Sequence, residues 1–178
     1  MRNLLPLLPM FAMLALAASL DWRARRIPNW LTLGLAAGGL VNSLFPATRL
    51  AGPDQALLGA GLGLALTFPM FWLGAIRGGD VKLIAALGAW LGPIGVIKLL
   101  VVQALVGLVI VLVQCAARGK LTALLSNSAV LAMNVAHVRE LGADHVGQAG
   151  QAYRSIDRPL PYAVPVLLAA VIVVGALM

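Results

Sequence analysis

The chain has 178 residues, of which 61% are hydrophobic and only 11% are charged. Soluble domains carry about 25% charged residues, so the composition excludes a water-soluble fold and predicts a protein of the lipid bilayer. A formal net charge of +7 is also found in nucleic-acid-binding proteins, but membrane topology accounts for the charge here, and we predict no nucleic-acid partner.

Six long stretches, uncharged except for Lys82, predict six transmembrane helices. Each approaches or reaches the roughly 20 apolar residues that cross a bilayer core as a helix. In chain order they lie at about 4–20, 28–46, 55–75, 81–97, 99–117 and 160–178. The alternation typical of a transmembrane barrel is missing and no linker divides the stretches, so we expect an all-α fold with a single integral membrane domain over residues 1–178.

The first stretch has the general form of a signal peptide, with Arg2 in front of it. It lacks a small-x-small cleavage site followed by a soluble domain, and the charged segment 21–26 leads directly into the next span. We therefore interpret it as a retained helix. In the third span, Gly59, Gly61 and Gly63 predict close helix packing rather than a phosphate-binding loop.

The basic residues predict the orientation, because Lys and Arg gather in cytoplasmic loops. With six spans and both chain ends outside, ten of the 13 basic residues face the cytoplasm, and the three others are Arg2, Arg49 and Lys98. A seventh span would reduce this to seven against six. We expect a multi-pass protein whose cytoplasmic face contacts an anionic lipid leaflet.

The region 118–158 is predicted to be cytoplasmic. Residues 121–138 are apolar at helical spacing but also carry serine, asparagine and histidine, which favours an amphipathic helix in the membrane interface, followed by a loop over 139–158. The histidines and acidic residues there match no standard helical zinc spacing, and Cys115 is the single cysteine. We predict no metal, no cofactor and no disulfide.

Asp21 and Asp80 are the candidate catalytic residues, because each is predicted at the cytoplasmic end of a span. Two close carboxyls cannot both ionise comfortably, so one can activate water as a general base while the other remains protonated and polarises a scissile carbonyl. Each aspartate also has a simpler interpretation. Asp80 can cap a helix, and Asp21 can pair with neighbouring arginines at the interface.

Three residues near Asp80 are expected to shape the site. Gly78 and Gly79 allow backbone conformations that larger residues resist. Lys82 is expected either to tune a carboxylate or bind substrate, or to anchor the span by reaching toward the interface.

Three segments together resemble the type IV prepilin peptidases. The run from Asp21 through Arg26, Ile27, Pro28 and Asn29 resembles that family's first catalytic segment, and residues 79–83 resemble its second, Gly-x-Gly-Asp-x-Lys. Residues 160–165 resemble the Pro-Tyr start of its last helix. The resemblance implies that Asp21 and Asp80 are catalytic, with Arg26, Pro28, Asn29, Gly78, Gly79 and Lys82 binding substrate or shaping the site.

The resemblance further implies a short, peptidase-only member of the kind found with Flp/Tad pilus systems. Asp21 at the end of the first span leaves no room for the insert that carries methyltransferase activity in long members, and Cys115 alone cannot supply its metal ligands. The implied substrate is a prepilin or pseudopilin cut at the cytoplasmic face of a bacterial inner (plasma) membrane. One position departs from the pattern, because Arg77 stands where the family has the first glycine.

Other readings stay open at this point. Archaeal preflagellin peptidases share the pattern. A small ion or proton transporter would use both aspartates as relay or binding groups, and a non-catalytic subunit of a secretion or pilus assembly would use them as caps and anchors. A homo-oligomer is compatible with all of these.

Overall fold

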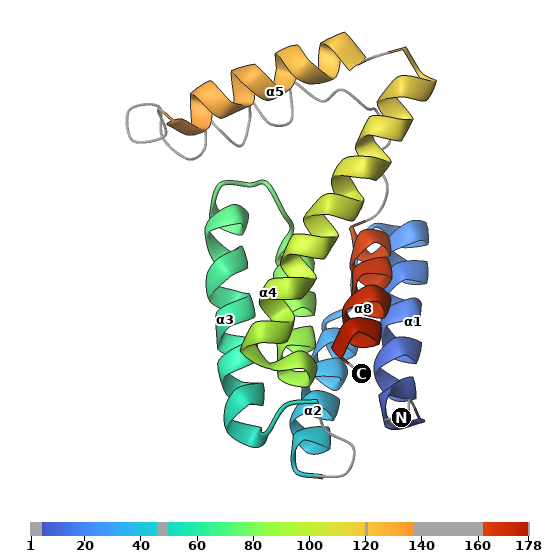
Figure 1. Ribbon diagram of the computed structural model, residues 1–178, viewed down its shortest axis with the longest axis vertical. Coiled ribbons are helices and arrows are strands. Elements are labelled where there is room, and N and C mark those ends of the chain that lie inside the picture. Colours follow the sequence, from blue (N-terminus) through green and yellow to red (C-terminus); the bar gives the residue numbers. More distant parts are fainter. Residues whose placement is uncertain (1–4, 46–49, 120, 137–161, 178) are drawn as a thin grey trace.

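The computed structural model describes residues 5–45, 50–119, 121–136 and 162–177, and within them every regular element is helical (Figure 1). A short 3₁₀ turn, Leu5–Leu7, precedes α1 (Leu8–Ala24), and α2 (Asn29–Ser43), α3 (Pro53–Trp72) and α4 (Gly78–Ala117) follow. The remaining helices are α5 (Leu121–Ala136) and α8 (Ala163–Leu177). The predicted all-α class is confirmed for this part of the chain.

Helix α4 consists of two helical segments that meet at Gly92. This glycine has φ 70° and ψ −178°, a conformation open to glycine, and Pro93 follows it. Proline suits the first position of a new helix because it has no N–H to satisfy there. From the sequence we placed the boundary between these two spans at Lys98, because we divided the spans at charged residues alone. Figure 1 shows the chain turning back at the lower end of the bundle, between residues 78–91 and 93–117.

Glycines bring α3 and the first segment of α4 into backbone contact. A Cβ added at Gly59 would collide with the carbonyl oxygen of Gly88, and one added at Gly63 would lie 3.0 Å from the carbonyl oxygen of Ile84. The two helices are therefore antiparallel and packed through small residues. Gly61 differs from the sequence-based expectation, because a Cβ there would meet nothing within 4 Å.

The buried core lies where α1, α2, the first segment of α4 and α8 meet. Leu14, Leu35, Leu87 and Val166 each contribute a fully buried side chain. Trp90 adds a buried hydrogen bond, since its Nε1 donates to the carbonyl oxygen of Leu35 at 2.8 Å. This bond satisfies the indole N–H inside an apolar environment.

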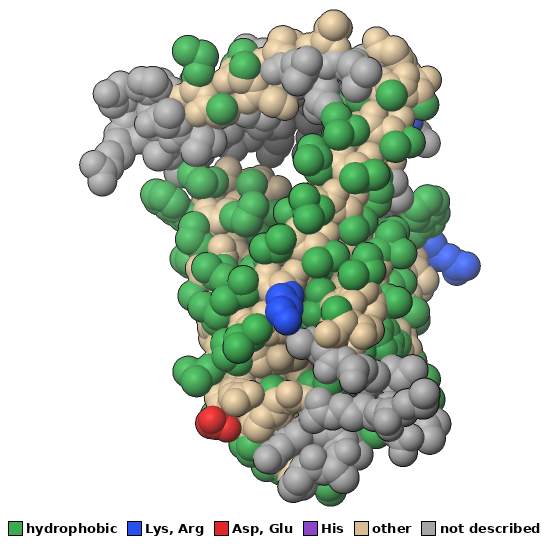
Figure 2. Space-filling model, viewed as in Figure 1, with side chains coloured by type: hydrophobic (Ala, Val, Ile, Leu, Met, Phe, Trp, Pro, Cys, Tyr) green, Lys and Arg blue, Asp and Glu red, His purple; other side chains and the backbone are tan. Residues whose placement is uncertain are grey.

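Helices α3 and α4 are long and apolar enough to cross a bilayer, and they are the two described helices that meet both conditions. Only 22% and 17% of their most apolar windows are buried inside the structure, so they are not core helices of a soluble protein. Large apolar side chains cover the face that Figure 2 shows, as expected for a surface that contacts lipid. Helix α8 is shorter but similarly apolar. The six-span count and the orientation remain predictions.

Helix α5 lies across one end of the bundle, steeply inclined to α3 (Figure 1). It covers most of the segment 121–138 in which the sequence predicted a helix. Its predicted place in the membrane interface stays a prediction. The loop predicted at 139–158, with its histidine and acidic residues, lies outside the described residues.

Candidate active site

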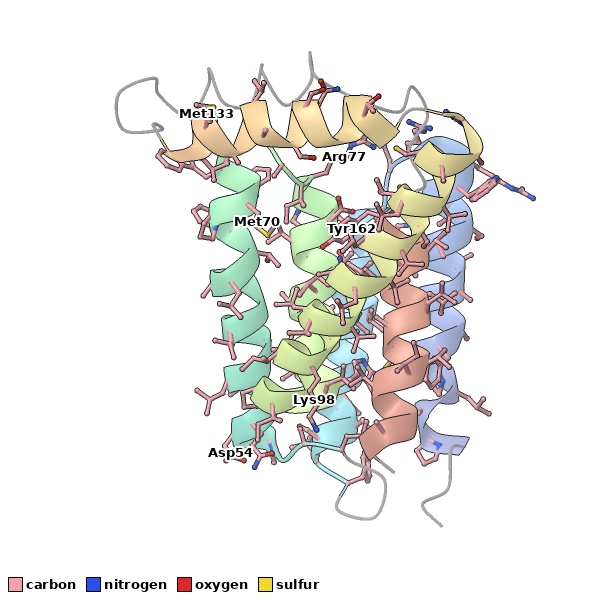
Figure 3. All side chains as sticks on the ribbon, turned by 45° about the horizontal axis from the view of Figure 1, so that its top comes forward. Asp54, Met70, Arg77, Lys98, Met133 and Tyr162 are labelled. Carbon is pink, nitrogen blue, oxygen red and sulfur yellow. The ribbon has the colours of Figure 1, made fainter. Side chains whose placement is uncertain are left out.

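Asp21 and Asp80 come together at the α5 end of the bundle. Asp21 lies in the last turn of α1 and Asp80 in the first turn of α4. Each side chain is only 5% exposed, and the two carboxylates are near enough to repel each other. Figure 3 places Arg77, which begins the Asp80 segment, at this end, and Asp54 and Lys98 at the opposite end. The fold thus brings the two predicted residues into one site.

Asp80 is held by the start of its own helix. Its Oδ2 accepts a hydrogen bond from the backbone N–H of Arg77 at 3.1 Å. Arg77 is the residue that caps α4, so Asp80 is not the N-cap itself but bonds back to it from the third helical position. The positive end of the α4 dipole therefore lies at this carboxylate and stabilises its negative charge.

Asp21 is held by a different helix. Its Oδ2 accepts a buried hydrogen bond, 3.1 Å long, from the backbone N–H of Ala163, the first residue of α8. Asp21 alone would lie at the unfavourable, negative end of α1, but the N-terminus of α8 offsets this effect. Each carboxylate thus has one oxygen bound to main chain at a helix start, which fixes two groups that repel each other.

The side chain of Arg77 joins the two predicted motif segments. Arg25 ends α1 with a left-handed φ of 51°, which is uncommon for a residue other than glycine, and its N–H bonds the carbonyl oxygen of Asp21 at 3.0 Å. The carbonyl oxygen of Arg25 in turn accepts a 2.6 Å hydrogen bond from Nη1 of Arg77. Arg77 therefore connects the Asp21 segment to the Asp80 segment.

The backbone at Arg77 does not need the glycine that the resemblance predicts at this position. Arg77 has φ −91° and ψ 155°, an extended conformation that any residue adopts. Gly78 and Gly79 begin α4 without a positive φ, so the special backbone conformation expected of them is wrong. A Cβ at Gly79 would lie 3.5 Å from Cβ of Ile27, an ordinary contact distance, so close packing does not require glycine there either.

A second bond joins the same two segments. Nζ of Lys82 donates to Oδ1 of Asn29 at 3.0 Å on the exposed side of the site. Pro28 precedes Asn29 in extended conformation and starts α2, where its carbonyl oxygen accepts the N–H of Leu31. Lys82 and Asn29 thus position the segments, and the bond observed for Lys82 is not to a carboxylate. Arg26 is exposed in the same segment, and its role stays a prediction.

Sequence reasoning did not select three groups that the structure adds to the site. The Ala163 N–H binds Asp21, the Tyr162 ring lies close enough to Asp80 to feel its charge, and Gln103 hydrogen-bonds the Tyr162 side chain. Two signals for them were present. Tyr162 belongs to the Pro-Tyr segment, and Gln103 is a polar residue inside an uncharged run.

Comparison with known proteins places these observations in a family context. The sequence model of the type IV leader peptidase family matches residues 8–112, which include both aspartates. Proteins named prepilin leader peptidase/N-methyltransferase are similar: one from Xanthomonas campestris pv. campestris is 36% identical over 110 residues, covering 58% of this chain and 38% of the relative. Its counterpart from Dickeya chrysanthemi is 34% identical over 105 residues, covering 55% and 36%.

A third such protein, from Klebsiella pneumoniae, is 33% identical over 90 residues, covering 47% of this chain and 39% of the relative. The chain thus matches less than two fifths of the length of each of these relatives. No solved structure matches the chain.

Proposed function

The chain belongs to the type IV leader peptidase family, and on this premise we propose that it is a membrane-embedded aspartic endopeptidase that removes the leader peptide of type IV prepilins or pseudopilins. The observation that carries the proposal is the convergence of Asp21 and Asp80, two buried carboxylates from distant parts of the sequence. A pair of this kind is suited to amide hydrolysis because its two members differ in protonation.

The hydrolysis needs one proton on the pair. The ionised carboxylate removes a proton from a water molecule, whose oxygen attacks the scissile carbonyl carbon. The protonated carboxyl donates a hydrogen bond to the carbonyl oxygen and stabilises the charge that develops there. Collapse of the tetrahedral intermediate breaks the C–N bond, and the leaving nitrogen takes a proton from the pair. One oxygen of each aspartate is bound to main chain, which leaves the other for this work.

The site is proposed to face the cytoplasm. Arg23, Arg25, Arg26 and Arg77 all lie on the segments that carry the aspartates, and basic residues of this density favour the cytoplasmic side and its anionic lipids. A bilayer boundary at this end would give the aspartates access to water. It would also hold the apolar helix of a prepilin in the lipid.

The proposed substrate is a Flp-type precursor, cut without N-methylation. Asp21 lies in the last turn of α1, so no room is left for an insert between this helix and Asp21, and Cys115 alone cannot form a cysteine-based metal site. The mass of the processed pilin tests this part. A mature N-terminus without the added mass of a methyl group is the expected product, and a methylated one would contradict it.

Asparagine substitution tests the catalytic pair. Asp21→Asn and Asp80→Asn preserve shape but remove the acid–base function, so each is expected to slow cleavage of a cognate prepilin in membranes by at least about 100-fold. Asp54→Asn, at the opposite end of the bundle, is the matched control and is expected to cleave normally. Normal processing by either well-inserted site variant would exclude the mechanism.

The same variants separate the other two readings. A transporter would conduct ions through reconstituted vesicles, would lose this flux when either aspartate is substituted, and would cut no prepilin in its unmodified form. Normal pilus assembly supported by the double asparagine variant would identify a non-catalytic subunit.

A further inference from the structure

A cavity of about 360 Å³ lies beside the candidate active site. It is bounded by α3, by the second segment of α4 and by the start of α8. Figure 3 shows Met70 of α3 and Tyr162 ahead of α8 at about the same level of the bundle. Most of its wall is apolar. The residues that line it include Thr67, Met70, Gln103, Ala104, Gly107 and Tyr162.

One polar group in this wall has no partner. Gln103 is only 8% exposed, and its Oε1 is buried without a hydrogen bond. Its side chain hydrogen-bonds the Tyr162 hydroxyl, so Nε2 makes that bond and Oε1 remains an unused acceptor. A buried acceptor without a donor is costly, and a ligand that supplies an N–H removes that cost.

Thr67 and Tyr162 carry the other polar side-chain groups of the wall. The hydroxyl of Thr67 donates to the carbonyl oxygen of Gly63 at 2.6 Å, within its own helix. Tyr162 is bonded to Gln103 and lies near enough to Asp80 to feel its charge. The cavity therefore offers one hydrogen-bond acceptor in apolar surroundings, directly beside the catalytic pair. A fitting ligand is apolar and carries a main-chain N–H at that point.

The start of an apolar helix meets this description. The first four N–H groups of a helix have no partner inside the helix. A peptide bond must be exposed to be hydrolysed, so a helix that follows the cut presents its free N–H groups close to the aspartates. The wall also provides room for it, because a Cβ added at Gly107 would meet nothing within 4 Å and Met70 is 48% exposed.

We propose that this cavity receives the first turn of the apolar helix that follows the cleavage site of the substrate, and that Oε1 of Gln103 accepts a hydrogen bond from a main-chain N–H of that turn. The inference rests on the proposed peptidase function and adds to it a subsite for the mature part of the substrate. Gln103 is then a substrate-binding residue, and Tyr162 orients its amide.

Two leucine variants test the hydrogen bond. Gln103→Leu keeps the volume and removes the acceptor. Gln114→Leu does the same at another glutamine of α4, a half-buried residue whose buried Oε1 has no partner and which does not line the cavity. For a full-length prepilin, Q103L is expected to reduce kcat/KM by roughly 10- to 100-fold, mainly through KM, and Q114L by less than about twofold. For a short peptide that contains the scissile bond but ends shortly after it and lacks the apolar helix, all forms should show equal kcat/KM.

Equal cleavage of the prepilin by Q103L and Q114L would overturn the inference. An equal loss on both substrates would also overturn it, because Gln103 would then act on the catalytic pair rather than on the helix. If the unmodified protein cuts no prepilin, the proposed peptidase function is wrong. If only the subsite is wrong, the unmodified protein still cuts the prepilin.

Crosslinking supplies a measurement that does not depend on activity. Gly107→Cys, in a Cys115→Ala background with Asp80→Asn to prevent cleavage, is expected to form a disulfide with a cysteine in the first turn after the cut. A cysteine placed one helical turn beyond the point where the substrate helix crosses the centre of the bilayer should not react. Absence of the first crosslink, or equal yields from both positions, would contradict the subsite even if Q103L does not fold.

Discussion

Gly59→Ala is expected to reduce both stability and cleavage, although it lies far from the aspartates. A Cβ at this position would lie 2.7 Å from Cα of Gly92 and would collide with the carbonyl oxygen of Gly88. The obstacles are backbone atoms, so no side-chain rotation can relieve the contact. The helices must separate by roughly 1 Å, and overpacking of this kind costs about 1–3 kcal/mol.

The shift reaches the site because Asp80 lies on the same helical segment, about two turns before Gly88. Misplacing a catalytic group by about 1 Å can cost about 100-fold in rate. We therefore expect Gly59→Ala to lower cleavage of a prepilin by roughly 10- to 100-fold. The midpoint of thermal unfolding in detergent should fall by roughly 2–10 °C.

Gly61→Ala is the matched control on the same helix. A Cβ there would meet nothing within 4 Å, and alanine favours a helix over glycine by about 0.5–1 kcal/mol. It should retain the cleavage rate and should keep or slightly raise the unfolding midpoint. If Gly59→Ala behaves like Gly61→Ala in both assays, the backbone contact between α3 and α4 is refuted, together with the coupling of that contact to Asp80.

Three further predictions concern the hydrogen bonds around the site and core. Trp90→Phe removes a buried bond while keeping an aromatic ring, so the free energy of unfolding should fall by about 1–2 kcal/mol, measured by denaturant titration; an unchanged value would contradict the bond. Lys82→Met breaks the exposed bond to Asn29, so the free energy of unfolding should fall by less than about 1 kcal/mol and the cleavage rate by no more than about 10-fold. Adding Asn29→Ala to this variant should cause no further loss. Arg77→Gly should retain cleavage within about 10-fold, because Arg77 adopts an ordinary φ and the variant loses one hydrogen bond, to Arg25, and one positive charge near Asp80. A complete loss in the membrane assay would show that the side chain is essential.

The sequence was sufficient to place the two aspartates at one end of the molecule. Spans of similar length with charged ends restrict which residues can share a face, so Asp21 and Asp80 could be paired without coordinates. The family resemblance is confirmed by the family match. The catalytic role of Asp21 and Asp80 stays a prediction.

The remaining features depend on contacts that no local pattern encodes. The donor for Asp21 is the main-chain N–H of Ala163, and any residue type other than proline supplies such a group. The turn at Gly92 was misplaced because charge marked Lys98 more strongly than a Gly-Pro pair inside an apolar run. Likewise, Arg77 stands where the resemblance predicts glycine, but its extended φ requires no glycine, and only the coordinates show this.

The bond between Asp21 and Ala163 has a consequence for biogenesis. Ala163 is synthesised 142 residues after Asp21, so a nascent chain already contains both aspartates in its first two motif segments while the donor for Asp21 does not yet exist. The pair reaches its final arrangement only when α8 has been inserted and packed. The last helix that the structure describes therefore completes the environment of a carboxylate near the start of the chain.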